Sequence, residues 1–224
     1  RTDLSSLMQV LEDNEIIPNN FIKKINVLKS VPERNKTYTK EVQEEIFEYL
    51  EKKDPTFLLY IKFISYNYLR PIEVNRIKVG DMNLKERTIS FKAKNKPLKT
   101  KIIPDILLSD IPDLSELDPE AFLFTPEKFG EKWATSENNK RDYFSKRFKK
   151  VVKDHFNLDK NYGLYSFRHT YITKLYRELR KISSPFEAKS RLMLITGHST
   201  MTALEKYLRD IDAELPEDYS YLIK

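Results

Sequence analysis

Residues 165–170 read YSFRHT, and this stretch decides how the rest of the sequence is interpreted. It begins a helix that we expect over residues 166–181, which places Arg168 in the first turn of that helix. Tyr207 follows nine residues after His198, near the end of the chain. Because each short stretch is common by itself, the information lies in their order. Three other stretches belong to the set: LRPIEV at residues 69–74, KNK at residues 94–96 and TGHST at residues 196–200.

Hydrophobic periodicity around these stretches predicts a mainly helical chain. A helix from Pro55 to about Leu69 is apolar almost all round, so it should lie in the core. Thr39 is a candidate N-cap for the helix before it, and Pro71 begins a short helix after it. Further helices are expected over residues 1–15, 139–154, 166–181, 187–196 and 200–209. Alternating segments at residues 88–91 and 99–103 predict a β-hairpin, with room for a third strand. The predicted fold class is α+β, mainly helical with a small antiparallel sheet.

The composition is that of a globular chain with a core. Of the 224 residues, 40% are apolar and 33% are charged, which suits one large domain or one domain with a fragment of another. No apolar run is long enough to span a bilayer, and residues 1–10 lack the layout of a signal peptide. The chain has no cysteine, which excludes disulfides, thiolate zinc sites and a cysteine nucleophile.

Charge is unevenly distributed along the chain. Lysine and arginine total 40 against 34 acidic residues, a net charge of +6. Residues 85–101 and 140–153 are strongly basic, whereas residues 105–120 and 210–218 are acidic. Such segregation favours a surface that binds a polyanion. Solvated helix faces explain the charge pattern by itself equally well.

Taken together, the four stretches and Tyr207 resemble the tyrosine recombinases, also called the phage-integrase family. The residues follow the family's order: an Arg with a Glu three residues on, a hairpin Lys, an Arg-His-Thr at a helix start, a Gly-His, and then a Tyr. The resemblance covers roughly residues 37–210. It implies the catalytic fold of that family, and it points to the integrases of bacterial mobile elements, which work in the cytoplasm.

The chemistry that the resemblance implies is the cleavage and rejoining of DNA. Tyr207 would attack the scissile phosphorus and form a 3′-phosphotyrosyl link, and this covalent capture makes ATP unnecessary for rejoining. A second negative charge develops during the attack, and fixed cations must stabilise it when no metal does. Arg70 and Arg168 would bind the two non-bridging oxygens, because a guanidinium donates two parallel hydrogen bonds and stays protonated. No cofactor and no metal is implied.

Two further catalytic roles follow from the resemblance. Lys94 matches the hairpin lysine that delivers a proton to the leaving 5′-oxygen, and nearby arginines would lower its pKa for this task. Its neighbours Lys92 and Lys96 leave open which lysine reaches the site. His198 could donate a hydrogen bond to a phosphate oxygen, although a lone His is more often structural. Tyr207 is one of 13 tyrosines, and its place after His198 alone distinguishes it from those that only pack.

One position departs from the family's pattern. The family usually has a His three residues before the second Arg, and this chain has Tyr165 there. Because a tyrosine has a pKa of about 10 and is a poor base at neutral pH, the group that accepts the proton of Tyr207 stays open. Tyr165 could still donate a hydrogen bond, and Glu73 is expected to orient Arg70 or Tyr165. His169 is expected to be a packed side chain without a catalytic role.

Basic residues outside this set are candidates for contacts with the DNA backbone. Lysines of the hairpin and of the helix expected over residues 139–154 would bind phosphates without reading sequence. The candidates are Lys92, Lys96, Lys99, Lys146 and Arg147.

The resemblance also divides the chain. Residues 1–18 resemble the last helix of a truncated N-terminal core-binding domain, residues 19–36 are expected to be a linker, and residues 37–224 are expected to form the catalytic domain with its C-terminal tail. The tail, residues 209–224, is acidic and has several apolar residues. In integrases such a tail commonly docks onto a neighbouring protomer. The apolar residues are Ile211, Leu215, Tyr219, Tyr221, Leu222 and Ile223.

Three functions are compatible with these observations. The resemblance favours a site-specific recombinase that acts on double-stranded DNA as a homotetramer on two sites, with a monomer in the absence of DNA left open and no membrane partner. A type IB topoisomerase-like enzyme would share the chemistry and relax DNA as a monomer. A DNA-binding module without catalysis is supported only by the missing His at position 165.

Overall fold

The computed structural model of the chain describes residues 2–26, 35–92 and 98–208. The chain forms two compact units, Arg1–Arg34 and Asn35–Lys224, and each is described by itself. In the first unit, helix α1 (Thr2–Asp13) is followed by the short 3-10 helix η1 (Phe21–Lys24). The side-chain amide of Asn20 donates a hydrogen bond of 2.9 Å to the carbonyl oxygen of Ser5 and so connects the two helices. The expected linker therefore contains a short helix, and the domain division stays a prediction.

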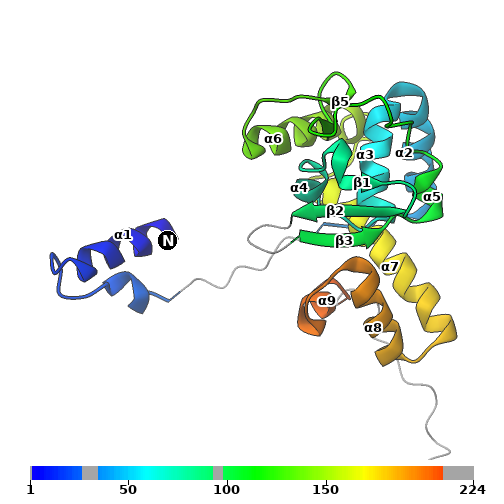
Figure 1. The fold of residues 1–224 in the computed structure, drawn as a ribbon. Coiled ribbons are helices and arrows are strands. Elements are labelled where there is room, and N and C mark those ends of the chain that lie inside the picture. The colour runs from blue at the N-terminus through cyan, green and yellow to red at the C-terminus, as the bar shows by residue number, and fades with distance from the viewer. Residues whose placement is uncertain (1, 27–34, 93–97, 209–224) are drawn as a thin grey trace, which may run out of the picture. The chain divides into compact units, whose positions relative to one another are not determined.

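The core of the second unit surrounds helix α3 (Pro55–Tyr66) (Figure 1). Asp54 caps this helix, because its side chain accepts a hydrogen bond of 3.1 Å from the backbone N–H of Phe57. Pro55 occupies the first turn, where a missing N–H leaves no bond unmade. Apolar side chains on all sides of α3 are fully buried, which confirms that it lies in the core; these are Phe57, Ile61, Phe63 and Ile64.

Two helices pack against α3. Helix α2 (Lys40–Lys53) begins at Thr39, whose hydroxyl accepts a hydrogen bond from the backbone N–H of Val42, as an N-cap does. Helix α7 (Leu164–Ile182) contacts α3 over its first half. Phe167 of α7 is fully buried in the same hydrophobic cluster. The residue after it in the sequence, Arg168, is thereby fixed at the edge of the core.

A three-stranded antiparallel sheet lies beside this helical core. Its order is β1 (Met82–Asn83), β2 (Thr88–Lys92) and β3 (Leu98–Ile102), so the predicted hairpin and the third strand are present. Ile89 pairs with Lys101 and Phe91 with Lys99. Because Ile89 and Phe91 are buried, the two lysines opposite them are on the inner face of the sheet. The alternate residues of β3, including Leu98 and Ile102, are exposed.

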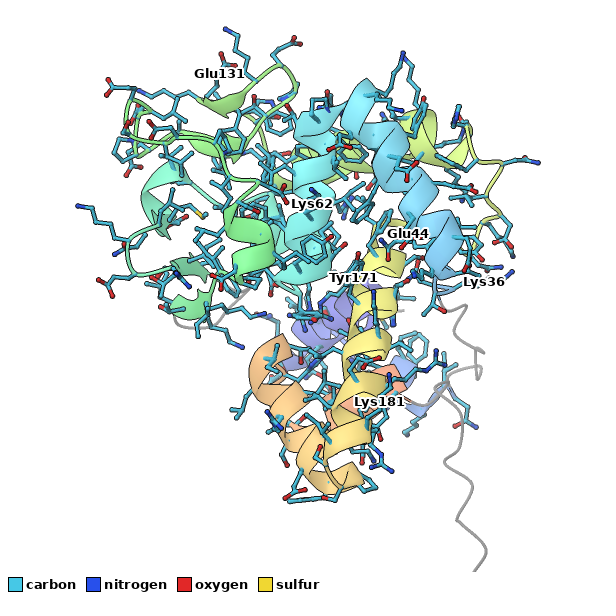
Figure 2. All side chains as sticks on the ribbon, turned by 90° about the vertical axis from the view of Figure 1, so that its right-hand side faces the viewer. Lys36, Glu44, Lys62, Glu131, Tyr171 and Lys181 are labelled. Carbon is cyan, nitrogen blue, oxygen red and sulfur yellow. The ribbon has the colours of Figure 1, made fainter. Side chains whose placement is uncertain are left out.

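The end of the described chain forms a second, smaller cluster of helices. The second half of α7 packs with α8 (Pro185–Thr196) and α9 (Met201–Leu208) around buried side chains such as Ile172, Leu192 and Leu204. Figure 2 shows α7 running from the larger group of elements, near Tyr171, into this smaller group, near Lys181. One helix therefore belongs to both clusters, and the residues of its first half face the junction between them.

The remaining elements complete the larger cluster. They are the short helices α4 (Pro71–Val74), η2 (Val79–Asp81) and α5 (Asp105–Leu108), the hairpin β4 (Phe122–Phe124) with β5 (Phe129–Glu131), and helix α6 (Glu137–Phe148) with its π-helical continuation η3 (Lys149–Lys153). The β4–β5 hairpin had not been predicted, because Pro112, Pro119 and Pro126 made this stretch look irregular. The fold class expected from the sequence, mainly helical with a small antiparallel sheet, is confirmed.

Candidate active site

Arg70 stands at the turn between α3 and α4, where Glu73 holds it. The Glu73 carboxylate accepts hydrogen bonds from the backbone N–H of Arg70 (2.7 Å) and from its Nη1 (2.9 Å). Glu73 is buried, whereas the Arg70 side chain is 39% exposed. Burial would lower the pKa of Arg70, but the negative charge of Glu73 raises it above its ordinary value. The guanidinium is therefore a permanent cation with a fixed direction.

Arg168, in the first turns of α7, is the largest fully buried side chain of the described residues. Its Nε donates a hydrogen bond of 2.8 Å to the carbonyl oxygen of Tyr68, a residue with the unusual φ of 56°. Its Nη1 is buried and has no hydrogen-bond partner among the residues that the structure describes. Burial, and to a lesser extent the charge of Arg70, lowers the pKa of Arg168. A buried donor without a partner costs free energy unless a ligand satisfies it.

His198 follows the end of α8. Gly197 ends this helix in the left-handed region at φ 75°, which turns the chain so that His198 is brought back against the helix. The His198 Nδ1 lies 2.6 Å from the hydroxyl of Thr196, while its Nε2 is buried and unpaired within the described part of the chain. Burial, followed by the charges of Arg168, Arg70 and two nearby lysines, lowers the pKa of His198 to about 3.

Tyr207, on α9, completes the group. The centroid of its ring lies 4.9 Å from Cζ of Arg168 and 4.9 Å from the ring centroid of His198. The ring of His169 stacks on it at 4.5 Å. A negative charge on Tyr207 would also raise the pKa of Arg70, so its hydroxyl lies within electrostatic reach of both guanidiniums. Residues 70, 168, 198 and 207, far apart in the sequence, therefore meet at one place.

Two lysines of β3 line the same place. Lys99 Nζ donates a hydrogen bond of 3.2 Å to the carbonyl oxygen of Gly197, and Lys101 Nζ donates one of 2.5 Å to the carbonyl oxygen of Asn67. Burial, followed by the charge of Arg168, lowers the pKa of Lys101 to about 7. With Arg70, Glu73 and Gly197, both lysines line a cavity of about 200 Å³. An anion entering this cavity would meet three cationic side chains.

Sequence reasoning had assigned Lys99 only to the DNA backbone and had not singled out Lys101. The signal that could have found Lys101 is its place in the hairpin, since it pairs with Ile89, an apolar residue of the inner face. Lys94 and Lys96 lie outside the described residues, so their predicted roles stay predictions. Lys92 ends β2, and its side chain also lies outside what the structure describes.

Tyr165 occupies the position where the resemblance expects a His, and it lies in the site. Burial, followed by the negative charge that Tyr207 would carry, raises the pKa of Tyr165 above its ordinary value, even though Arg70 and Arg168 oppose the shift. A phenol that is harder to ionise than a free tyrosine is a hydrogen-bond donor at neutral pH rather than a base.

The two candidate DNA contacts of α6 differ from each other. Lys146 is exposed. Arg147 is instead engaged in the fold: its Nε and Nη2 donate hydrogen bonds of 2.7 Å to the two carboxylate oxygens of Asp54, the residue that caps α3. This bidentate pair occupies one edge of the guanidinium, and Nη1 donates a further hydrogen bond of 3.3 Å to the carbonyl oxygen of Pro126. Arg147 thus helps to hold the fold together, and its contact with DNA stays a prediction.

The described residues form neither a cluster of metal ligands nor a membrane-spanning helix. Within residues 2–26, 35–92 and 98–208, no three His, Asp or Glu side chains gather in a way that could hold a metal ion. No helix in those ranges is both long and apolar enough to cross a membrane.

Comparison with known proteins gives similarity in structure only. No protein-family model matches the chain, and no curated protein matches it. Among solved structures, XerA recombinase is 14% identical over 88% of this chain and 65% of that chain, with a TM-score of 0.57. A lambda integrase dimer bound to a COC′ core site is 14% identical over 96% of this chain and 59% of that chain, with a TM-score of 0.68.

A third structure, the Tn1549 transposon integrase in complex with circular intermediate DNA, is 15% identical over 99% of this chain and 84% of that chain, with a TM-score of 0.61. This chain spans less than two thirds of the XerA and lambda integrase chains. At such identities the likeness establishes the fold, and it agrees with the order of the sequence motifs. The chain therefore has the fold of the tyrosine recombinases and integrases, with the mainly helical architecture and small antiparallel sheet of their catalytic domain.

Proposed function

We propose that this chain is the catalytic part of a site-specific DNA recombinase or integrase, which cleaves and rejoins DNA through a 3′-phosphotyrosyl intermediate without metal or ATP. One observation carries the proposal. The unpaired Nη1 of Arg168 and the unpaired Nε2 of His198 are buried beside the ring of Tyr207. The unpaired donor on Arg168 would be satisfied by a non-bridging phosphate oxygen, and the unpaired nitrogen of His198 is available to the reaction beside the phenol.

Binding of the phosphodiester is the first step of the proposed reaction. The non-bridging oxygens accept hydrogen bonds from Arg70 and Arg168, and the guanidinium of Arg70 is already directed by Glu73. Because both groups are fixed before the DNA arrives, little reorganisation is needed as the second negative charge develops on phosphorus. Lys99, hydrogen-bonded to the Gly197 carbonyl, adds a third positive charge at the wall of the cavity.

Attack and departure follow. The Tyr207 oxygen forms a bond to phosphorus while the bond from phosphorus to the 5′-oxygen breaks, and the leaving oxygen takes a proton. Lys101 is the described lysine best suited to give that proton, because its pKa of about 7 makes it a stronger acid than an ordinary lysine. Lys94, the lysine that the resemblance indicates, is the alternative. Rejoining is the same sequence in reverse, with a 5′-hydroxyl as the attacking group.

Double-stranded DNA is the proposed substrate, and a homotetramer on two sites is the proposed assembly. An apolar groove supports the assembly. It encloses about 770 Å³ and is lined in part by the exposed side chains of Ile102, Ile106 and Leu194. Lys174 lies at the same groove. The tail with its apolar residues, supplied by a second copy of the chain, fits such a groove in hydrophobicity, and its acidic residues could pair with Lys174.

The test is capture of the covalent intermediate. The chain is incubated with a duplex half-site, nicked so that the released 5′-fragment diffuses away, and the products are separated under denaturing conditions. We expect a protein–DNA adduct with the wild type and none with Tyr207→Phe. Tyr176→Phe, which changes a buried tyrosine of the smaller helix cluster, is the matched control and should keep the adduct. An adduct that survives Tyr207→Phe would refute the nucleophile.

Two other outcomes would replace the proposal. If the chain binds DNA in a salt-sensitive way but forms no adduct under any condition, it is a DNA-binding module without catalysis. Relaxation of supercoiled DNA by the chain without any target site would indicate a type IB topoisomerase-like enzyme.

A further inference from the structure

The group that accepts the proton of Tyr207 can be sought among the side chains that surround the ring, and His198 is the one whose chemistry is decided by its partners. Thr196 Oγ1 donates its single proton to the carbonyl oxygen of Leu192, at 2.7 Å. The same oxygen lies 2.6 Å from His198 Nδ1, so at that contact the hydroxyl can only accept. Nδ1 therefore carries the ring proton.

A neutral imidazole that is protonated on Nδ1 has a lone pair on Nε2. His198 is neutral in the free protein, because burial and the charges of Arg168, Arg70, Lys101 and Lys99 keep a second proton off the ring. Its Nε2 is buried and has no partner in the described ranges. The ring stands at 62° to that of Tyr207, with centroids 4.9 Å apart, so an edge of the imidazole can face the phenol. The site thus holds an unused proton acceptor beside the nucleophile.

The other neighbours are less suited to accept this proton. Arg70 and Arg168 stay protonated. Burial raises the pKa of Tyr165, which keeps it a donor. Glu73 already uses both carboxylate oxygens for Arg70. The ring of His169 stacks on Tyr207 at 26°, and the lone pair of a stacked imidazole lies in its own plane and not toward the partner's hydroxyl.

We infer that His198 is the general base of this site: its Nε2 takes the proton of the Tyr207 hydroxyl as the tyrosine oxygen bonds to phosphorus. The inference rests on the proposed function and departs from the role of phosphate donor that the sequence suggested for His198. The proton moves from Tyr207 to His198, the phosphorus–O5′ bond breaks, and the leaving oxygen takes a proton from the acid. Rejoining returns the first proton from His198 to Tyr207. The imidazolium forms while the phosphate gains negative charge, and that charge offsets the four cations.

Thr196 acts through His198 as a positioning residue. Its hydroxyl fixes the tautomer, because it offers Nδ1 an acceptor and no donor. The carbonyl of Leu192 in α8 fixes the hydroxyl in turn.

The experiment compares single-turnover adduct formation for two forms of His198 and two forms of Tyr207. His198→Gln removes the base and supplies an amide N–H that can donate to a phosphate oxygen, so a histidine that only bound the phosphate would be replaced adequately. We expect it to slow adduct formation by about 100-fold or more. Replacing Tyr207 by a fluorinated tyrosine, whose phenol is more acidic, should restore most of that loss in the His198→Gln protein and change the wild type little.

Two results would overturn the inference. One is that the His198→Gln protein forms the adduct at a rate within a few-fold of the wild-type rate. The other is that the fluorinated tyrosine does not restore the rate that His198→Gln loses. The tautomer provides a test without any variant. The chain has only three histidines, so nitrogen chemical shifts in the free protein can be assigned, and a proton on Nε2 in place of Nδ1 would also overturn it. If the wild type forms no adduct, the proposed function itself is refuted. If the wild type forms the adduct but the fluorinated tyrosine does not rescue His198→Gln, only the assignment of His198 as the base is refuted.

Discussion

The guanidinium carbon of Arg168 lies 4.9 Å from the centre of the Tyr207 ring. Arg168 is fixed from behind by the carbonyl of Tyr68, and Tyr207 belongs to a helix of the smaller cluster. A guanidinium at the face of an aromatic ring is attracted to it, so this contact helps to hold α9 against the site. The contact that packs α9 against α7 therefore also places the positive charge of Arg168 beside the proposed nucleophile, Tyr207.

Arg168 is expected to lower the stability of the fold that it serves. We predict that Arg168→Met abolishes adduct formation while raising the free energy of unfolding by about 1 kcal/mol, because a buried guanidinium with an unpaired nitrogen is replaced by an apolar chain of similar length. The measurement is urea denaturation of both proteins. Arg147→Met is the control, and it should destabilise the chain by about 3 kcal/mol because it leaves the carboxylate of Asp54 without its partner. Equal destabilisation by both substitutions would contradict the prediction.

Lys101 is expected to matter for the leaving group. Lys101→Met should slow cleavage of an ordinary half-site by about 100-fold or more. It should cleave normally a substrate with sulfur at the bridging 5′ position, because a thiolate leaves without a proton. Lys99→Met is the matched control on the same strand, and it should weaken DNA binding without any such rescue. If Lys94→Met is rescued by sulfur and Lys101→Met is not, the proton donor is Lys94.

The lowered pKa of Lys101 has a consequence for stability that needs no DNA. Its pKa is about 7 in the folded chain and about 10.4 in the unfolded chain. Between these values the unfolded state binds more protons, so the free energy of unfolding rises with pH in this window. Below about pH 7 both states hold the proton and the cost of burying the charge is fully present. The free energy of unfolding of the wild type should therefore rise relative to that of Lys101→Met between pH 7 and pH 9.5. Denaturation of both proteins at the two pH values measures this. If the difference between the two free energies stays constant, the pKa of Lys101 is that of an ordinary lysine.

The apolar groove gives a prediction about assembly. Ile106→Glu places a negative charge on an exposed wall of the groove, away from the cavity of the candidate active site, where it should repel the acidic tail of a second copy. We expect the variant to form the adduct on a half-site at the wild-type rate, yet to lose complexes that hold two DNA sites, as measured by native gel mobility. Ile182→Glu is the control, since Ile182 is also exposed, at the end of α7, and does not line the groove. Loss of two-site complexes with both variants would point to a general effect of surface charge.

Much of this fold could be predicted because its signals are local. The Thr39 and Asp54 caps, the apolar run of α3 and Pro71 mark helix boundaries within one or two turns of chain. The β4–β5 hairpin was missed because its strands have three residues each and are surrounded by prolines, too short for an alternating pattern to show.

The sequence by itself determined which chemical groups the chain offers and in what order: two arginines, a cluster of lysines, a histidine after a glycine, and a late tyrosine. Tertiary structure decided which of them meet. Sequence spacing could not tell Lys101 from the other lysines, because the face of a strand is set by its pairing partner, here Ile89 across the hairpin. Nor could it set the proton on His198, since that depends on the hydroxyl of Thr196 and on the backbone carbonyl of Leu192, which only a folded helix end brings together.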